Sequence, residues 1–249
     1  MRYVSRSSLA ILAGLAVMTP SLAQSPADGL SARGVVNANA SAVLSSEVAA
    51  KIESMPFKAG AAFRKGDELV RFDCSRYEAQ LNGLEATVRK QQTLLSQKER
   101  LQKRQAAGAF EVEDARADLL RASADVKAME AEMRGCVIAA PYDGRVVEKV
   151  ANAHESPAPN APLMKILDDG SLEIDLIVPS TWLKWLKPGS EFRFAIEETG
   201  EVHDAKIVRL GAQIDAVSQT IKVTGAFSDN LNSIVPGMSG TGTFSAPEM

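Results

Sequence analysis

The strongest hydrophobic pattern lies in the central part of the chain, where apolar residues recur at alternating intervals of three and four. From residue 112 onward the apolar positions are Val112, Ala115, Leu119, Ala122, Val126, Met129 and Met133. This heptad spacing places one apolar seam along a coiled-coil helix. The same rhythm runs from Tyr77 to Leu95, after which Lys98 and Gln102 occupy seam positions and weaken it. The pattern predicts two helices that pack against each other.

The stretch between the two predicted helices, QAAGAF, contains Gly108. Glycine readily adopts the left-handed conformation that ends many helices, so the chain should reverse here into an antiparallel hairpin over residues 75–135. Basic residues close the first helix and acidic residues open the second, which stabilises both helix ends and equally suits a docking surface. At 1.5 Å per residue the first helix would reach about 45 Å, so the hairpin should project as a rod.

The first residues indicate export. Arg2 and Arg6, a short apolar run and the small residues SLA are typical of a secretory signal peptide over residues 1–23. The apolar run is too short to cross a bilayer, which takes about twenty residues, and neither cysteine lies near the cleavage point to carry a lipid. Removing the two arginines shifts the formal charge from −3 to −5, which argues against nucleic acid as a partner. We expect the mature chain to be free in an exported compartment.

The two cysteines of the chain flank the predicted hairpin. Cys74 comes just before it and Cys136 just after it. An antiparallel hairpin brings its ends together, and an exported compartment is oxidising enough to join two thiols. We predict a disulfide between Cys74 and Cys136 at the base of the hairpin; two unrelated buried thiols are the alternative.

The segments on either side of the hairpin share a layout. Residues 50–73 and 144–169 carry apolar residues at matching spacings of seventeen and twenty. Two such short-strand units are each too small for a core, so they should pair face to face around a shared one, with Asp143 and Gly144 making a turn. The residues expected at positive φ are Gly60 and Gly66 in the first copy and, opposite them, His154 and Asn160 in the second.

After residue 169 the pattern changes to alternating apolar and polar residues. The stretches SLEIDLIV, EFRFAI, AKIVRL and TIKVTGAF are separated by KPGS, EETGE and SDN. This is typical of half-buried antiparallel strands joined by tight turns.

Several of these stretches together resemble a known family. GAAFRKGDELVRFD and IAAPYDGRV resemble the two halves of the split lipoyl-like domain of periplasmic adaptor subunits, the HlyD-like membrane fusion proteins of bacterial efflux and type I secretion systems. AQIDAVSQTIKV and VPGMSGTGTF resemble parts of the small β-barrel of the same family. The resemblance implies a mainly β fold with an inserted coiled-coil α-hairpin. Its domains would be a split lipoyl/biotinyl-like domain (34–74 and 136–169) and an antiparallel β-barrel (170–246), with the membrane-proximal domain of the family absent.

The resemblance implies a function in positioning partners. An adaptor of this kind links an inner-membrane transporter, of the RND or ABC type, to the periplasm or to an outer-membrane channel, and works as a homo-oligomer. The candidates for partner contact at the hairpin tip are Arg100, Leu101, Arg104, Gly108 and Phe110. The serine that usually completes the tip motif of the family is missing here. A soluble periplasmic scaffold or regulatory subunit that forms no conduit therefore stays open as an alternative.

The sequence offers little chemistry. Lys165 in LMKIL is similar to the modified lysine of biotin carrier domains, but its alternation with Leu163 and Leu167 places it in a strand and away from a hairpin tip. No nucleophile with a base, phosphate loop or metal-ligand spacing is visible. We expect no enzymatic activity, no cofactor and no metal.

Overall fold

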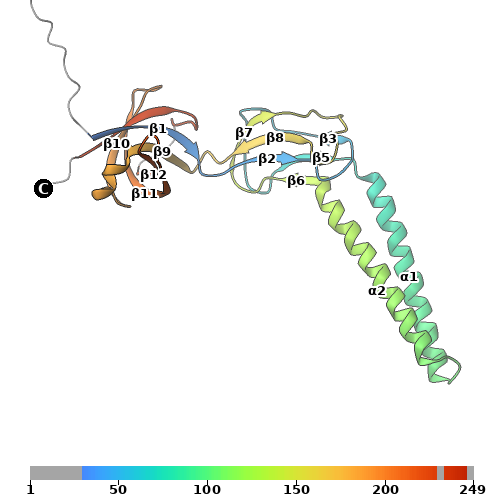
Figure 1. The fold of residues 1–249 in the computed structure, drawn as a ribbon. Coiled ribbons are helices and arrows are strands. Elements are labelled where there is room, and N and C mark those ends of the chain that lie inside the picture. Colours follow the sequence, from blue (N-terminus) through green and yellow to red (C-terminus); the bar gives the residue numbers. More distant parts are fainter. Residues whose placement is uncertain (1–29, 229–232, 246–249) are drawn as a thin grey trace, which may run out of the picture.

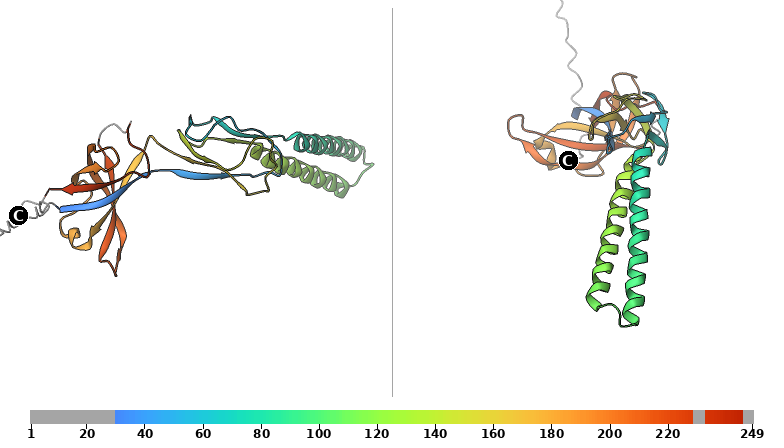
Figure 2. Two further views of the ribbon diagram at one scale, coloured as in Figure 1. Left: turned by 90° about the horizontal axis from the view of Figure 1, so that it is seen from above. Right: turned by 90° about the vertical axis from the view of Figure 1, so that its right-hand side faces the viewer.

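The structure is a computed structural model that describes residues 30–228 and 233–245. A β-barrel, a two-sheet unit and a helical hairpin follow one another along an elongated molecule (Figure 1). The hairpin leaves the two-sheet unit on the side away from the barrel and at an angle to the long axis, as the two further views in Figure 2 also show. The barrel and the hairpin tip therefore lie at opposite ends. The predicted signal peptide lies outside the described residues.

Six antiparallel strands close into the barrel, in the order β1-β13-β10-β11-β12-β9. Their bounds are Leu30–Ala38 for β1, Leu172–Pro179 for β9, Glu191–Ile196 for β10, Val202–Asp215 for β11, Thr220–Phe227 for β12 and Ser239–Phe244 for β13. Alternate residues are buried, as in β9, because successive side chains of a strand point to opposite faces. A short 3-10 helix, η2 (Ser180–Lys184), packs Trp182 edge-on against Phe244 at 5.3 Å between ring centroids. The strands predicted after residue 169 are confirmed.

One predicted boundary is wrong. The sequence places residues 34–38 in the split domain, but they belong to β1, which closes the barrel between β13 and β9. Ala32, Gly34 and Val36 are its buried positions. A Cβ atom on Gly34 would lie 2.7 Å from the side chain of Leu176, so a larger residue would not fit at this closure. The barrel is thus built from both ends of the described chain.

The two-sheet unit holds a second, separate core. One sheet has the order β2-β8-β7-β4 and the other β3-β5-β6. The strands are β2 (Ser41–Ser45), β3 (Ile52–Ser54), β4 (Ala62–Phe63), β5 (Glu68–Phe72), β6 (Val137–Ala139), β7 (Gly144–Lys149) and β8 (Pro162–Leu167). Strands from before the hairpin pair with strands from after it in both sheets: β2 with β8, β4 with β7 and β5 with β6. Each half therefore completes the core of the other.

The matching turns of the two halves are present. Gly60 and Gly66 have φ values of 81° and 89°, and His154 and Asn160 have 74° and 64°. Glycine has no Cβ to clash at positive φ, and asparagine and histidine are enriched there among the other residues. The spacing comparison therefore located the same backbone conformation in both copies.

Gly144 does not make the predicted turn. It is the first residue of β7, and it has no positive φ. A Cβ atom at this position would lie 2.0 Å from the carbonyl oxygen of Leu167. Glycine is needed here because two backbones approach closely, and the bend falls on the preceding residues, where the Asp143 carboxylate accepts a hydrogen bond from the Lys65 N–H at 2.7 Å.

The hairpin consists of α1 (Ser75–Lys103), α2 (Ala109–Met133) and a closing 3-10 turn, η1 (Arg134–Cys136). The predicted apolar seam faces the partner helix: Tyr77, Leu95, Val112 and Ala122 are buried, and the other apolar seam residues are half-buried. With 29 residues, α1 is about 44 Å long.

The residue that ends α1 differs from the prediction. Gln105, with φ 57°, takes the left-handed conformation, whereas Gly108 is the extended N-cap of α2. The N–H groups of Gln105 and Ala106 bond to the carbonyls of Gln102 and Leu101, which satisfies the helix end before the glycine is reached.

Candidate functional site

The root of the hairpin is closed by a disulfide. Cys74, the N-cap residue of α1, is bonded to Cys136 at the end of η1, with 6.1 Å between their Cα atoms. The disulfide predicted from the sequence is confirmed. The strands that lead to the two cysteines, β5 and β6, are themselves paired. The covalent link thus extends this pairing to the point where the helices begin.

Asp73 organises the start of α1. Its carboxylate accepts hydrogen bonds from the Ser75 hydroxyl at 2.8 Å and from the Ser75 N–H at 3.2 Å. These two bonds favour the ionised form and hold the pKa of Asp73 below its ordinary value. The first turn of α1 is therefore fixed by its own side chains as well as by the disulfide.

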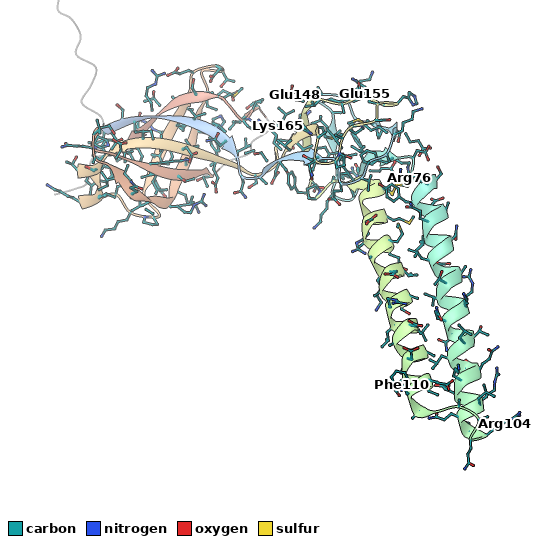
Figure 3. All side chains as sticks on the ribbon, turned by 45° about the vertical axis from the view of Figure 1, so that its right-hand side comes forward. Arg76, Arg104, Phe110, Glu148, Glu155 and Lys165 are labelled. Atoms are coloured by element: carbon teal, nitrogen blue, oxygen red, sulfur yellow. A yellow bond between two sulfur atoms is a disulfide. The ribbon has the colours of Figure 1, made fainter. Side chains whose placement is uncertain are left out.

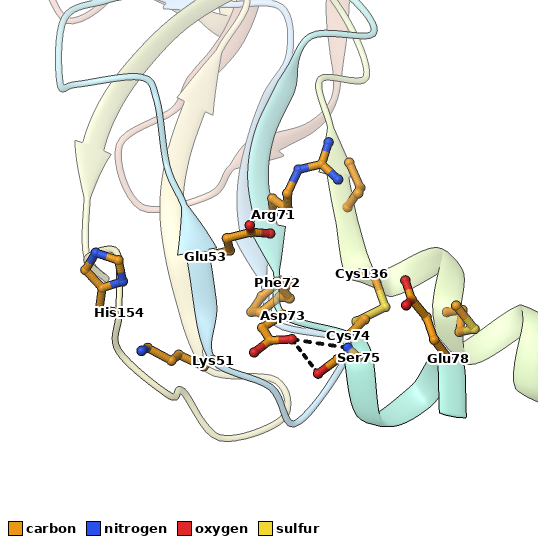
Figure 4. A pocket seen from close by; sticks show the side chains of 12 residues that line it. Lys51, Glu53, Arg71, Phe72, Asp73, Cys74, Ser75, Glu78, Cys136 and His154 are labelled. Carbon is orange, nitrogen blue, oxygen red and sulfur yellow. Dashed lines mark hydrogen bonds between the residues drawn. A yellow bond between two sulfur atoms is a disulfide. The ribbon is translucent and has the colours of Figure 1, made fainter. Parts of the chain in front are cut away.

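A groove of about 600 Å³ opens beside the disulfide (Figure 4). Its lining residues are Lys51, Glu53, Arg71, Phe72, Asp73, Cys74, Ser75, Glu78, Met133, Cys136, Val137 and His154. Three carboxylates and two cations line it, and one of the cations, Arg71, is held in an ion pair with Glu68. The groove has no excess of positive charge that would attract an anion.

The hairpin tip gathers the residues that the sequence proposes for partner contact. Arg100, Leu101 and Arg104 lie in the last turns of α1, and Gly108 and Phe110 begin α2. Phe110 is 81% exposed and Leu101 41% exposed, so both present apolar side-chain surface at the tip. Figure 3 shows Arg104 and Phe110 at the far end of the hairpin.

The cations of the hairpin tip lie mainly at the end of α1, and most carboxylates near the tip are engaged in ion pairs. Lys98 bonds to Glu111 across the two helices, and this contact lowers the pKa of the Glu111 carboxyl. Arg116 lies between two carboxylates, at 3.5 Å from Glu99 and 3.0 Å from Glu113. The basic residues of the last turns of α1, Arg100, Lys103 and Arg104, pair with no described carboxylate. The end of α1 therefore places cations beside the exposed side chains of Leu101 and Phe110, and Asp114 adds a negative charge in the first turns of α2.

The two flanks of α2 carry opposite charges, a feature that the sequence analysis missed. Residues seven or eleven apart lie on one side of a helix, because these intervals are close to two and three turns. Asp125 and Glu132 lie on one flank, and Lys127 and the C-cap residue Arg134 lie on the other. Asp118 and Arg116 lie on the same two flanks, but their charges are engaged in ion pairs with Arg121 and with Glu99 and Glu113. The spacing of these charges in the sequence could have revealed the two charged flanks.

Other kinds of site have little support within residues 30–228 and 233–245. No group of three or more His, Cys, Asp or Glu side chains in this part could hold a metal ion. None of its helices combines the length and apolar character needed to cross a membrane. Lys165 lies within β8 between Val43 and Glu148 of the neighbouring strands (Figure 3), so it is not presented at a turn as a carrier lysine would be.

An antiparallel six-stranded barrel, a two-sheet unit and an inserted helical hairpin define the fold of the membrane fusion, or periplasmic adaptor, proteins. The membrane fusion protein Spr0693 from Streptococcus pneumoniae R6 matches with a TM-score of 0.74 and 15% identity, over 88% of this chain and 99% of that chain. A MacA-MexA chimeric protein that contains the Pseudomonas aeruginosa MexA α-hairpin matches with a TM-score of 0.73 and 22% identity, over 87% and 80%. MacA from Actinobacillus actinomycetemcomitans gives 0.64 and 19%, over 87% and 78%.

Sequence comparison finds matches of low identity. No protein-family model matches the chain. Nodulation protein NolF of Rhizobium meliloti (strain 1021) is 25% identical over 195 residues, which cover 72% of this chain and 53% of NolF. An uncharacterized protein of Haemophilus influenzae (strain ATCC 51907 / DSM 11121 / KW20 / Rd) is 22% identical over 195 residues, with 78% and 51% covered. The chain thus spans about half the length of these curated relatives. The resemblance to membrane fusion proteins is confirmed, and at these identities it establishes the fold.

Proposed function

We propose that the protein is a periplasmic adaptor, which links an inner-membrane transporter of the RND or ABC type to the periplasm or to an outer-membrane channel. The observation that supports this most directly is the rod: α1, with 29 residues, carries the tip about 44 Å from its root, at the opposite end of the molecule from the barrel (Figure 1). A protein of this shape can hold two partners at a fixed separation without acting on a substrate.

In this proposal each part has its own task. The exported chain loses residues 1–23, the two-sheet unit is the split lipoyl-like domain, and the barrel faces the transporter. The two parts have separate cores, so contacts of the barrel with a partner leave the packing at the hairpin root unchanged.

The hairpin tip makes the second contact. The cations of the last turns of α1 favour an acidic partner surface, and the exposed ring of Phe110 favours an apolar pocket within it. A large aromatic side chain surrounded by charge is a common energetic centre of protein interfaces. Phe110 thus supplies the binding energy that the missing serine of the family motif does not.

Copies of the chain associate side by side along their hairpins. In such an arrangement the acidic flank of one α2 faces the basic flank of its neighbour, and Asp125 lies at nearly the same level as Lys127. Complementary charge of this kind fixes the register between copies more than it adds affinity.

Site-specific photo-crosslinking in cells tests the proposal. A crosslinker at Phe110 should capture an outer-membrane channel, and one at Val217, a 96% exposed residue in the turn after β11, should capture an inner-membrane transporter. Ala128, an exposed residue of α2 near the hairpin root, is the control position and should capture only neighbouring copies. If Phe110 captures only periplasmic or inner-membrane proteins, the protein is a scaffold that forms no conduit.

A further inference from the structure

The disulfide at the hairpin root forms part of the wall of a groove. Cys74 and Cys136 are 7% and 8% exposed, and both line the groove of about 600 Å³ between the two-sheet unit and α1 (Figure 4). This volume is in the range of pockets that admit a small molecule. Both cysteines belong to the core of the two-sheet unit, at the edge where this groove opens.

We propose that the Cys74–Cys136 disulfide is a redox-sensitive site, which a dithiol reductant attacks through this groove while the chain stays folded. The inference concerns the hairpin root and does not depend on the partners proposed above. The whole chain has two cysteines, so the reduced thiols have no other partner within it. The site therefore has two simple states, bonded and open.

The position of Cys74 sets the direction of the exchange. A thiolate of the reductant attacks Sγ of Cys136, a new S–S bond forms there, and the old bond breaks with its electron pair on Sγ of Cys74. Cys74 is assigned as the leaving group because it is the N-cap residue of α1, where the helix dipole favours negative charge, although its side chain makes no hydrogen bond to the first turn. The second thiol of the reductant then releases Cys136. Two electrons and two protons reach the protein, and the reductant becomes a disulfide.

Opening the bond loosens the root of the rod. Without it, the start of α1 and the end of α2 are joined only by non-covalent contacts, and the last backbone pair between β5 and β6 is Arg71 with Val137. Met129 and Met133 of α2 are only half-buried against the core of the two-sheet unit. The open state should therefore allow the helix roots to move apart.

The rate of reduction of the full chain by dithiothreitol tests the access. Free thiols are alkylated at intervals and counted by mass spectrometry. If the reductant attacks the folded chain, the rate of reduction is proportional to the dithiothreitol concentration and does not change with urea below the unfolding transition. A rate that rises with urea from the lowest concentrations, as for attack on the unfolded chain alone, would overturn the proposal.

A pair of matched variants tests the route. Val137 lines the groove and is 37% exposed, whereas Val147 is 42% exposed in β7 and does not line it. Val137→Trp should slow reduction about tenfold because the exchange depends on access to the sulfur, and Val147→Trp should leave it unchanged. Thermal unfolding checks that both variants fold. Equal rates in the two folded variants would contradict the route through the groove.

Two further measurements test the direction and the consequence. When glutathione is the reductant, the trapped mixed disulfide should carry glutathione on Cys136. Recovery of glutathione on Cys74 alone would refute the assignment of Cys74 as the leaving group. Hydrogen exchange should rise at the first turn of α1 and the last turn of α2 after reduction. Unchanged exchange at both turns would show that the bond does not control the root.

Discussion

Removing the disulfide should destabilise the two-sheet unit and the hairpin together. The change is the double substitution Cys74→Ala and Cys136→Ala, which removes the link without burying a hydroxyl group. The bond joins residues separated by 62 positions. In the chain-entropy model, a loop of this length contributes about 4 kcal/mol, because the cross-link restricts the unfolded chain. This is a large part of the stability of an ordinary domain.

The protein offers an internal control for this measurement. The barrel has its own core, which shares no residue with the core of the two-sheet unit. Both tryptophans of the chain, Trp182 and Trp185, lie in the barrel region, whereas the long helices belong to the hairpin. Tryptophan fluorescence therefore follows barrel unfolding, and far-ultraviolet circular dichroism follows the hairpin.

Urea titration of the double variant should shift the dichroism transition alone. We expect its free energy of unfolding to fall by about 4 kcal/mol while the fluorescence transition stays in place. A loss below about 1 kcal/mol would mean that the bond restricts little in the unfolded chain. An equal shift of both transitions would refute the separation into two independent cores.

Three other predictions follow from single sites. Gly144→Ala should destabilise the two-sheet unit by about 3 kcal/mol or more, because the added Cβ would overlap a carbonyl oxygen. Gly83→Ala lies in open space within α1 and should stabilise the hairpin by about 0.5–1 kcal/mol. Calorimetry that gave both changes the same sign would contradict this prediction. Hydrogen bonds from Ser218 and its neighbour lower the pKa of Asp215, so their stabilisation of the turn is present above the unfolded pKa and is lost as the pH falls through the folded pKa. The amide protection factors of this turn, corrected for the intrinsic exchange rate, should fall in acid, and Asp215→Asn should show no such fall. Lys127→Glu should weaken self-association measured by sedimentation, and adding Asp125→Lys should restore it because the charges of the two flanks are then exchanged. A double variant that associates more weakly than the single one would exclude the proposed packing.

The parts of the structure that were predictable from the sequence depend on local periodicity. The heptad spacing marked the apolar seam of both helices because packing requires apolar residues at that interval. The repeated layout marked His154 and Asn160 as positions of positive φ because equivalent turns need equivalent backbone conformations. The disulfide was predictable for a related reason, since an antiparallel hairpin returns the chain to its starting point.

The errors occur where the cause is not local. Residues 34–38 alternate in the same way in a barrel strand as in any other strand, so only their pairing with β9 and β13 assigns them. Gly144 is needed because the backbone of Leu167, more than twenty residues away, approaches it. At the tip, backbone hydrogen bonds to the carbonyls of Leu101 and Gln102 end α1 before Gly108 is reached. A rule that places the helix end at the glycine does not take these hydrogen bonds into account.

The adaptor function proposed above, in which the chain holds two partners apart, depends on the stiffness of the hairpin root more than on the chemistry of its tip. Because α1 is about 44 Å long, a tilt of about 10° at its base moves the tip by about 8 Å, which is enough to lose a docking contact. The root is correspondingly reinforced: besides the disulfide, Gly135 packs so closely that an added Cβ would lie 2.9 Å from the Cβ of Glu47 and 3.1 Å from the side chain of Val48. A Gly135→Ala variant should thus retain the seam of the hairpin but change the direction in which it points. Reduction of the disulfide would change the same angle between the hairpin and the two-sheet unit. A redox change at the root would therefore displace the tip without any change in the residues that bind there.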